Sequence, residues 1–210
     1  MIIIASVKKF TENDVSAILA HNERSIHTPS NLDIQPELRS LNYHLEPVRP
    51  LSCYDYFKKR KSELYSFQRK DVKVMAGWII TAPRELPAEQ QKAFFRTTYQ
   101  FLADRYGSEN IVQAVVHCDE AGQPHLHCCF IPVVPDSKHA QGFKICASEV
   151  LNRQELRNFH PALQKALLDA GIQAKVQTGI TRKNGRNYSV AELKQKELQY
   201  NHKEVQSWTW

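Results

Sequence analysis

Hydrophobic residues recur along the chain with two different periods. Short runs rich in β-branched and aromatic residues predict strands at residues 2–7 and 72–81. Apolar residues spaced three and four positions apart predict helices at residues 12–20, 88–105 and 152–170. Strands and helices are thus interspersed along the chain, which predicts a mixed rather than an all-helical or all-strand fold.

The segments between these elements are less regular. Residues 25–49 are rich in Pro, Asn and Ser and predict a long loop, and loops of this length in compact domains are usually functional. The basic and aromatic segment that follows, up to Lys70, is expected to be helical in part, and residues 143–146 predict a short strand. The element order predicts an α+β fold, with a mainly antiparallel sheet, helices on one face and the other face free.

Two apolar runs, at residues 111–116 and 128–134, flank a polar turn and predict a β-hairpin. Because side chains alternate between faces, His125 and His127 point the same way, and His117 shares their face in the right register. Three neutral imidazoles on rigid strands can converge on one divalent ion. The opposite face is expected to enter the core and carries Val112, Ala114, Val116, Leu126, Cys128 and Phe130.

Composition limits the class of protein. With 210 residues, of which 42% are hydrophobic, we expect one domain over residues 1–210, with residues 172–210 as its C-terminal extension. No apolar run approaches the roughly 20 residues of a membrane span, and no secretory signal opens the chain, so a cytoplasmic location is expected. The five cysteines are odd in number and lack C-x-x-C spacing, which favours reduced thiols.

The net charge of +6 favours a polyanionic partner. The densest basic run interrupts an aromatic segment that contains Tyr54, Tyr56 and Phe57. Such a mixture suits a single strand of nucleic acid, because phosphates meet the cations and unstacked bases meet flat side chains. A solvated helix face is the alternative interpretation. The residues of this basic run are Lys58, Lys59, Arg60 and Lys61.

The chain carries a set of motifs that together resemble one family. His117-x-Asp-Glu120 followed by Pro124-His-x-His127 is similar to the histidine-hydrophobic-histidine signature of HUH endonucleases. Four other segments resemble motifs of one branch of these enzymes, the MobV (Mob/Pre) plasmid mobilisation relaxases: His21-Asn-Glu-Arg24, Asn31, Leu41-Asn-Tyr-x-Leu45 and Tyr188-Ser-Val-Ala-Glu-Leu-Lys194. The resemblance implies a palm-like, RNA-recognition-motif-like HUH domain.

The resemblance also implies an activity. Such relaxases nick one strand of plasmid DNA at an origin of transfer, remain attached to its 5′ phosphate and later rejoin the ends. It implies a metal held by His117, His125 and His127, with Mn²⁺ as the expected ion and Mg²⁺ as the alternative. The implied partners are the single-stranded and hairpin DNA of that origin, with a coupling protein of a transfer apparatus as a further partner.

The resemblance assigns the catalytic roles as well. The nucleophile would be His21, and Arg24 would clamp the phosphate. Glu120 would orient His21 or take its proton, with Glu23 and Asp119 as alternatives for this role. Alternative nucleophiles are Tyr43, Tyr54 and Tyr56. The residues expected to position DNA, or to brace the loop, are Asn31, Asn42 and Tyr43.

One position departs from the family pattern. The branch usually has an acidic residue between the Tyr and the Leu of its Asn-Tyr-x-Leu motif, and this chain has His44. If a carboxylate assists a proton transfer there, the activity or its pH dependence would change. The competing interpretations are an HUH replication initiator or transposase, and a non-catalytic DNA-binding module with a structural metal.

Overall fold

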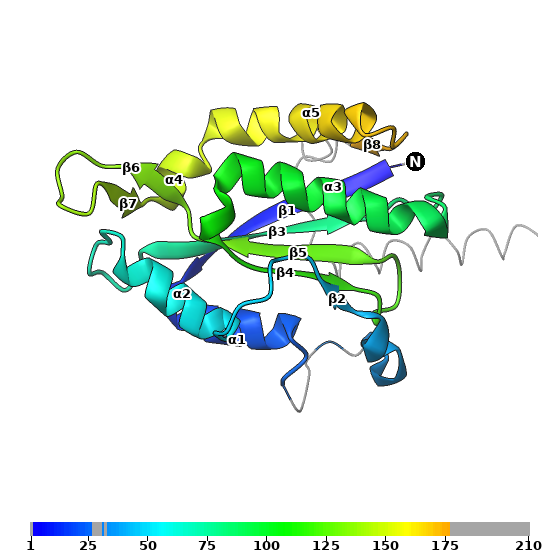
Figure 1. Cartoon of the computed structure of the whole chain (residues 1–210), viewed down its shortest axis with the longest axis horizontal. Helices are drawn as coiled ribbons and strands as arrows, with labels where there is room; N and C mark the ends of the chain where they lie inside the picture. The colour runs from blue at the N-terminus through cyan, green and yellow to red at the C-terminus, as the bar shows by residue number, and fades with distance from the viewer. Residues whose placement is uncertain (1, 27–30, 32, 177–210) are drawn as a thin grey trace, which may run out of the picture. The chain divides into compact units, whose positions relative to one another are not determined.

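A central antiparallel sheet organises the part of the chain that the computed structural model describes, residues 2–26, 31 and 33–176 (Figure 1). Its strands lie in the order β2-β4-β5-β3-β1-β8, and all neighbours are antiparallel except β1 and β8. The strands are β1 (Ile2–Thr11), β2 (Tyr43–His44), β3 (Lys73–Thr81), β4 (Ile111–His117), β5 (His125–Phe130) and β8 (Lys175–Val176). The predicted α+β class with a mainly antiparallel sheet is confirmed.

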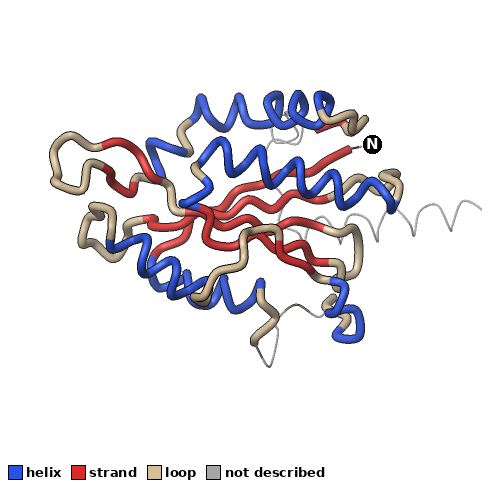
Figure 2. Tube along the Cα trace, viewed as in Figure 1, coloured by secondary structure: helices blue, strands red, loops and turns tan. Residues whose placement is uncertain are grey.

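Helices pack on both sides of this sheet (Figure 2). The apolar sides of α3 (Ala88–Tyr106) and α5 (Arg153–Asp169) cover one face, as predicted. The other face was expected to be free, but α1 (Glu12–Asn22) and α2 (Cys53–Ser62) pack on part of it. The smaller elements are the helices η1 (Pro36–Leu41), η2 (Ser108–Asn110) and α4 (Ala147–Val150), and the separate hairpin of β6 (Val133–Pro135) and β7 (Phe143–Ile145).

The two faces of the sheet support two hydrophobic cores. On the α3 and α5 side, Trp78 of β3 stacks on Phe159 of α5 with ring centroids 3.5 Å apart. On the other side, Val15 of α1 packs in a cluster that includes Val112 of β4. Val112 was predicted on the first face, but a β-bulge between Ile111 and Gln113 reverses its direction.

The predicted helices at 12–20, 88–105 and 152–170 are all confirmed, with bounds that differ by one or two residues. Thr11 begins α1 with a capping box, in which its side chain and backbone pair with Asp14. The predicted C-terminal extension beyond residue 176, with the motif at Tyr188, lies outside the described residues. Within the described part, no helix is long and apolar enough to cross a membrane.

Candidate metal centre

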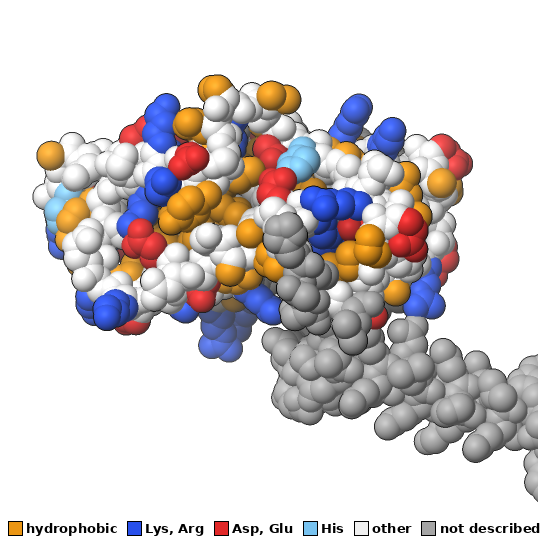
Figure 3. Space-filling view, turned by 90° about the horizontal axis from the view of Figure 1, so that it is seen from below, with side chains coloured by type: hydrophobic (Ala, Val, Ile, Leu, Met, Phe, Trp, Pro, Cys, Tyr) orange, Lys and Arg blue, Asp and Glu red, His pale blue; other side chains and the backbone are white. Residues whose placement is uncertain are grey.

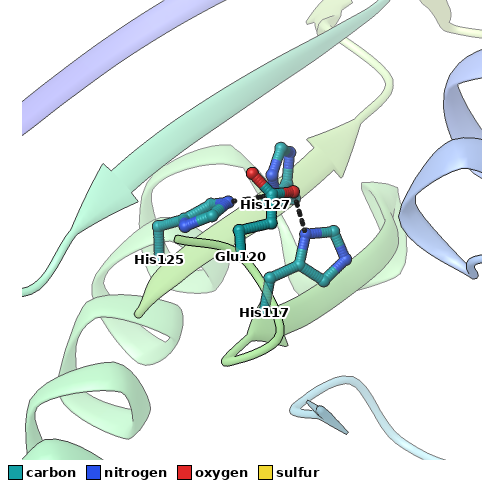
Figure 4. A group of neighbouring side chains, drawn as sticks. All are labelled: His117, Glu120, His125 and His127. Carbon is teal, nitrogen blue, oxygen red and sulfur yellow. Dashed lines mark ion pairs between the residues drawn. The ribbon is translucent and has the colours of Figure 1, made fainter. Parts of the chain in front are cut away.

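The β4–β5 hairpin brings the three predicted histidines together (Figure 4). Pairing places His117 opposite His125 and places Val115 opposite His127, so all three imidazoles rise from one face. Their ring centroids lie 4.6–5.5 Å apart. Glu120, from the turn between the strands, completes a group whose potential ligand atoms all lie within 4.8 Å of one another. The shared face of the three histidines was therefore predicted correctly.

Hydrogen bonds fix which ring nitrogen faces the centre. Nε2 of His117 lies 2.8 Å from the carbonyl oxygen of Asn22 and must donate to it, which leaves Nδ1 unprotonated in the neutral ring. Nδ1 of His125 similarly faces the carbonyl of Gln123 at 3.2 Å, so its Nε2 is directed toward Glu120. The neutral tautomers thus leave nitrogen lone pairs available at the centre.

Two of these nitrogens are buried without a hydrogen-bond partner: Nδ1 of His117 and Nε2 of His127. A buried polar atom that lacks a partner is costly, and an ion at the centre would supply one for both. Burial lowers the pKa of His117 to about 4 and that of His127 well below its usual value, so both rings are neutral at physiological pH. Neutral imidazoles and one carboxylate fit a divalent transition metal.

Glu120 is held in place by two side chains outside the histidine cluster. Its carboxylate accepts hydrogen bonds from Arg24 Nη2 at 2.6 Å and from Asn31 Nδ2 at 2.9 Å, while His117 Nδ1 lies 3.7 Å away. The sequence indicated a proton-transfer role for this residue but not a place in the ligand group. Its position three residues after His117, on a turn fixed by pairing between Ile34 and Glu120, makes it a candidate fourth ligand.

Arg24 connects this carboxylate to a buried one. Its guanidinium forms two hydrogen bonds to Asp119, of 2.8 Å from Nε and 2.7 Å from Nη2, and Asp119 is fully buried. Burial opposes the charge of Asp119, but the hydrogen bonds and the positive charge of Arg24 outweigh it and lower the pKa of this carboxyl. Arg24 adopts a left-handed backbone with φ of 56°, a conformation that costs a non-glycine residue about 1–3 kcal/mol. The carboxylates hold the residue in this strained conformation.

His21 lies in the last turn of α1, beside the histidine cluster. Its ring meets that of His127 edge-on with centroids 6.4 Å apart. It lines a cavity of about 360 Å³ together with Arg24, Arg39 and Asp119. Burial, and next the charge of Arg24, lower the pKa of His21, so its imidazole is neutral near pH 7. Arg39, on η1, was missed in the sequence because nothing in its surroundings distinguishes it from a solvated loop arginine.

Asn42 and Tyr43, predicted to contact DNA or brace the loop, both hold the loop to the sheet. Asn42 Oδ1 accepts from the backbone N–H of Cys118 at 2.7 Å, and Tyr43 pairs with Val116 in the ladder. Burial raises the pKa of Tyr43 to about 12, which makes its phenolate hard to form. This environment disfavours Tyr43 as a nucleophile.

The basic run on α2 lies far from the histidines. Arg60 donates to Asn110 Oδ1 at the start of β4, whereas His117 ends that strand, roughly 20 Å away at about 3.3 Å per residue. Lys58 and Lys61 form ion pairs with Asp55 and Glu12. Viewed from the side of α1 and α2, cations, carboxylates and apolar side chains are interspersed rather than gathered in one basic patch (Figure 3).

His44, which departs from the family pattern, lies between two carboxylates. Its Nδ1 is 2.8 Å from Glu46 Oε1 and its Nε2 is 3.4 Å from Glu23 Oε2. These two partners, Glu23 first, raise the pKa of His44 to about 10, so the ring is positively charged at neutral pH. The three residues line a second cavity of about 660 Å³ that also borders Tyr54. His44 therefore acts as a cation here and does not take over the role of a carboxylate.

Comparison with solved structures defines the class of this domain. The chain superposes on a manganese-bound crystal structure of the MobM relaxase domain with plasmid pMV158 oriT DNA, with a TM-score of 0.78 and 29% identity, over 93% of this chain and 99% of that one. The fold is that of a relaxase domain. The family model for plasmid recombination enzymes (Mob/Pre) matches residues 1–196, and the chain belongs to this family.

Curated relatives of this chain are also named plasmid recombination enzymes. A plasmid recombination enzyme of Streptococcus agalactiae is 30% identical over 91% of this chain, and one of Lactiplantibacillus plantarum is 31% identical over 91%. The chain spans only 38% and 52% of the length of these two proteins. It corresponds in length to the relaxase domain of the solved structures rather than to the whole relatives.

Proposed function

We propose that this chain is a metal-dependent DNA strand transferase, a relaxase that nicks one strand at a plasmid origin of transfer and later rejoins it. The observation that carries the proposal is the convergence of three imidazole rings and Glu120 beside His21, which itself lines a cavity with Arg24 and Arg39. The name of the curated relatives and the oriT DNA bound to the MobM domain support the same substrate.

The metal would be held by His117, His125 and His127, and Mn²⁺ is the proposed ion. When bound, it would polarise the scissile phosphate and offset the charge that develops on it. The manganese of the MobM structure supports this choice. The other proposed steps depend on side chains of this chain.

His21 is the proposed nucleophile. A lone pair of its neutral imidazole attacks phosphorus, a P–N bond forms, and the bond from phosphorus to the 3′ oxygen breaks. The ring loses its remaining N–H proton and the leaving 3′ oxygen gains one, so the products are a 5′ phosphoramidate and a free 3′ hydroxyl. Arg24, held by Asp119, would bind a non-bridging phosphate oxygen, and Glu120 would carry the proton.

The DNA would be contacted beyond the scissile phosphate as well. Arg39 lies in the same cavity as His21 and would take a neighbouring phosphate. Asn31 would position the strand through its contact with Glu120, and the basic run on α2 would bind more distant DNA. We place this activity in the bacterial cytoplasm, with a coupling protein of a transfer apparatus as a further partner.

The experiment uses a strand end-labelled on either side of the nick. Wild-type protein is incubated with Mn²⁺ and single-stranded DNA from the pMV158 origin, or from the region that flanks its own gene, and resolved on a denaturing gel. We expect the 3′-side fragment to migrate as a protein adduct with wild type and with the control His139→Ala, but not with His21→Ala. A free 5′ phosphate would instead indicate a hydrolase, and binding without cleavage would indicate a DNA-binding module.

A further inference from the structure

A chain of hydrogen bonds, buried in its middle, runs from the metal centre along the C-terminal end of α1. His117 Nε2 donates to the carbonyl of Asn22, and Asn22 Nδ2 donates to Gln113 Oε1, both at 2.8 Å. Gln113 Nε2 then donates to Glu23 Oε1 at 2.7 Å. Gln113 is fully buried and Asn22 is 2% exposed. Every link is thus within hydrogen-bond distance, and solvent is excluded from its middle.

This series of hydrogen bonds continues to the loop beside β2. Glu23 meets His44, His44 meets Glu46, and Glu46 Oε2 accepts from the backbone N–H of Ala114 at 2.9 Å. Ala114 follows Gln113 in β4, so the chain of contacts returns to the strand from which it starts. This closed arrangement ties the end of α1 to the strand that carries His117.

We propose that Gln113 is a positioning residue, which holds the end of α1 so that His21 faces the metal centre and His117 presents Nδ1 to the ion. The inference rests on the proposed function. Gln113 can position both His21 and His117, because its side-chain amide forms hydrogen bonds with Asn22 and Glu23, the two residues that follow His21 in the sequence. It also donates to the carbonyl of Leu19 at 3.3 Å, one of the last carbonyls of the helix.

The donor and acceptor roles in the network determine which nitrogen of His117 faces the ion. The Asn22 carbonyl accepts only from a protonated Nε2, so its position determines the tautomer of His117. Asn22 reaches that position because its side chain is bound to Gln113. Groups that orient a metal-binding histidine in this way typically change metal affinity about 10–100-fold when they are lost.

The test measures Mn²⁺ affinity by calorimetry, without DNA, at a temperature where each variant is fully folded. Gln113→Glu keeps the shape but places a carboxylate against Glu23, and we expect it to weaken Mn²⁺ binding about tenfold. Gln113→Glu combined with Glu23→Gln re-forms the bond with its polarity reversed and is expected to recover most of the affinity. If Gln113→Glu does not fold, Gln113→Met replaces it, with Gln164→Met as the control.

The possible outcomes distinguish a failure of the role proposed for Gln113 from a failure of the proposed metal-dependent function. If wild type binds Mn²⁺ and the Gln113 variants bind it equally well, Gln113 has only a structural role and the inference is wrong. If wild type binds no Mn²⁺, the metal-dependent function itself fails. Gln164 bonds the backbone around β8, away from the histidines, so its variant is expected to lose stability but to keep the wild-type Mn²⁺ affinity.

Discussion

The ion pair between Arg24 and Asp119 gives a direct measure of how the site is held together. Asp119→Asn removes the charge from a side chain with no exposed surface, while Arg24 itself is 6% exposed. Removing one partner of a buried ion pair typically costs about 3–5 kcal/mol, because the other charge remains buried. Arg24 retains its bond to Glu120 at 2.6 Å, so we expect the lower end, about 3 kcal/mol.

The assay is urea unfolding at pH 7 with EDTA present, so that metal binding does not contribute. The matched control is Glu155→Gln, which neutralises a less buried pair with Arg105 and is expected to cost about 1 kcal/mol. A loss for Asp119→Asn of no more than that of the control would refute the reasoning.

The same substitution has a pH signature. The folded-state pKa of Asp119 is lowered, so its stabilisation is complete above the unfolded pKa of about 3.9 and is lost as the pH falls through the folded value. Wild type should therefore lose more stability than Asp119→Asn on acidification below about pH 4. Equal acid slopes for the two proteins would contradict this assignment.

Three further predictions concern DNA, metal and alkaline pH. Arg39→Ala should weaken oligonucleotide binding and reduce the slope of log K against log salt by about 0.7, one phosphate contact on a single strand, whereas Lys59→Ala should affect only oligonucleotides long enough to reach α2. Chelation should abolish nicking but leave the far-UV circular dichroism unchanged; unfolding would instead indicate a structural ion. The pKa of His44 is raised to about 10, so its stabilisation is full below about pH 6.5 and declines toward pH 10. The free energy of unfolding of His44→Gln, measured with urea at several pH values, should not show this decline.

The histidine cluster could be predicted from the sequence because it depends on local rules. His125 and His127 are two apart on one strand, and the short turn leaves few registers in which His117 can share their face. The long helices were predictable for the same reason, since their apolar stripes have a regular period. Helix α5 runs through Pro161 without being divided, because tertiary packing overrides the local cost.

Other features depend on contacts between distant segments. The direction of Val112 is set by a bulge, which alternation along the strand does not reveal. Arg39 reaches the His21 cavity only because residues 33–35 pair with the turn at 119–121. The basic run on α2 has the composition of a nucleic-acid site. Composition does not reveal that this run lies near the start of β4, whereas His117 lies at its end.

The central claim is that His21 carries the DNA, and peptide mapping of the covalent adduct tests it most directly. After Mn²⁺-dependent cleavage, the protein is digested at neutral or alkaline pH, because phosphoramidates are labile in acid, and the nucleotide-bearing peptide is sequenced by mass spectrometry. We predict a 5′-linked nucleotide on His21 in the segment that ends α1. A nucleotide on Tyr43, Tyr54 or Tyr56 would contradict the assignment of the nucleophile, although the chain would remain a relaxase.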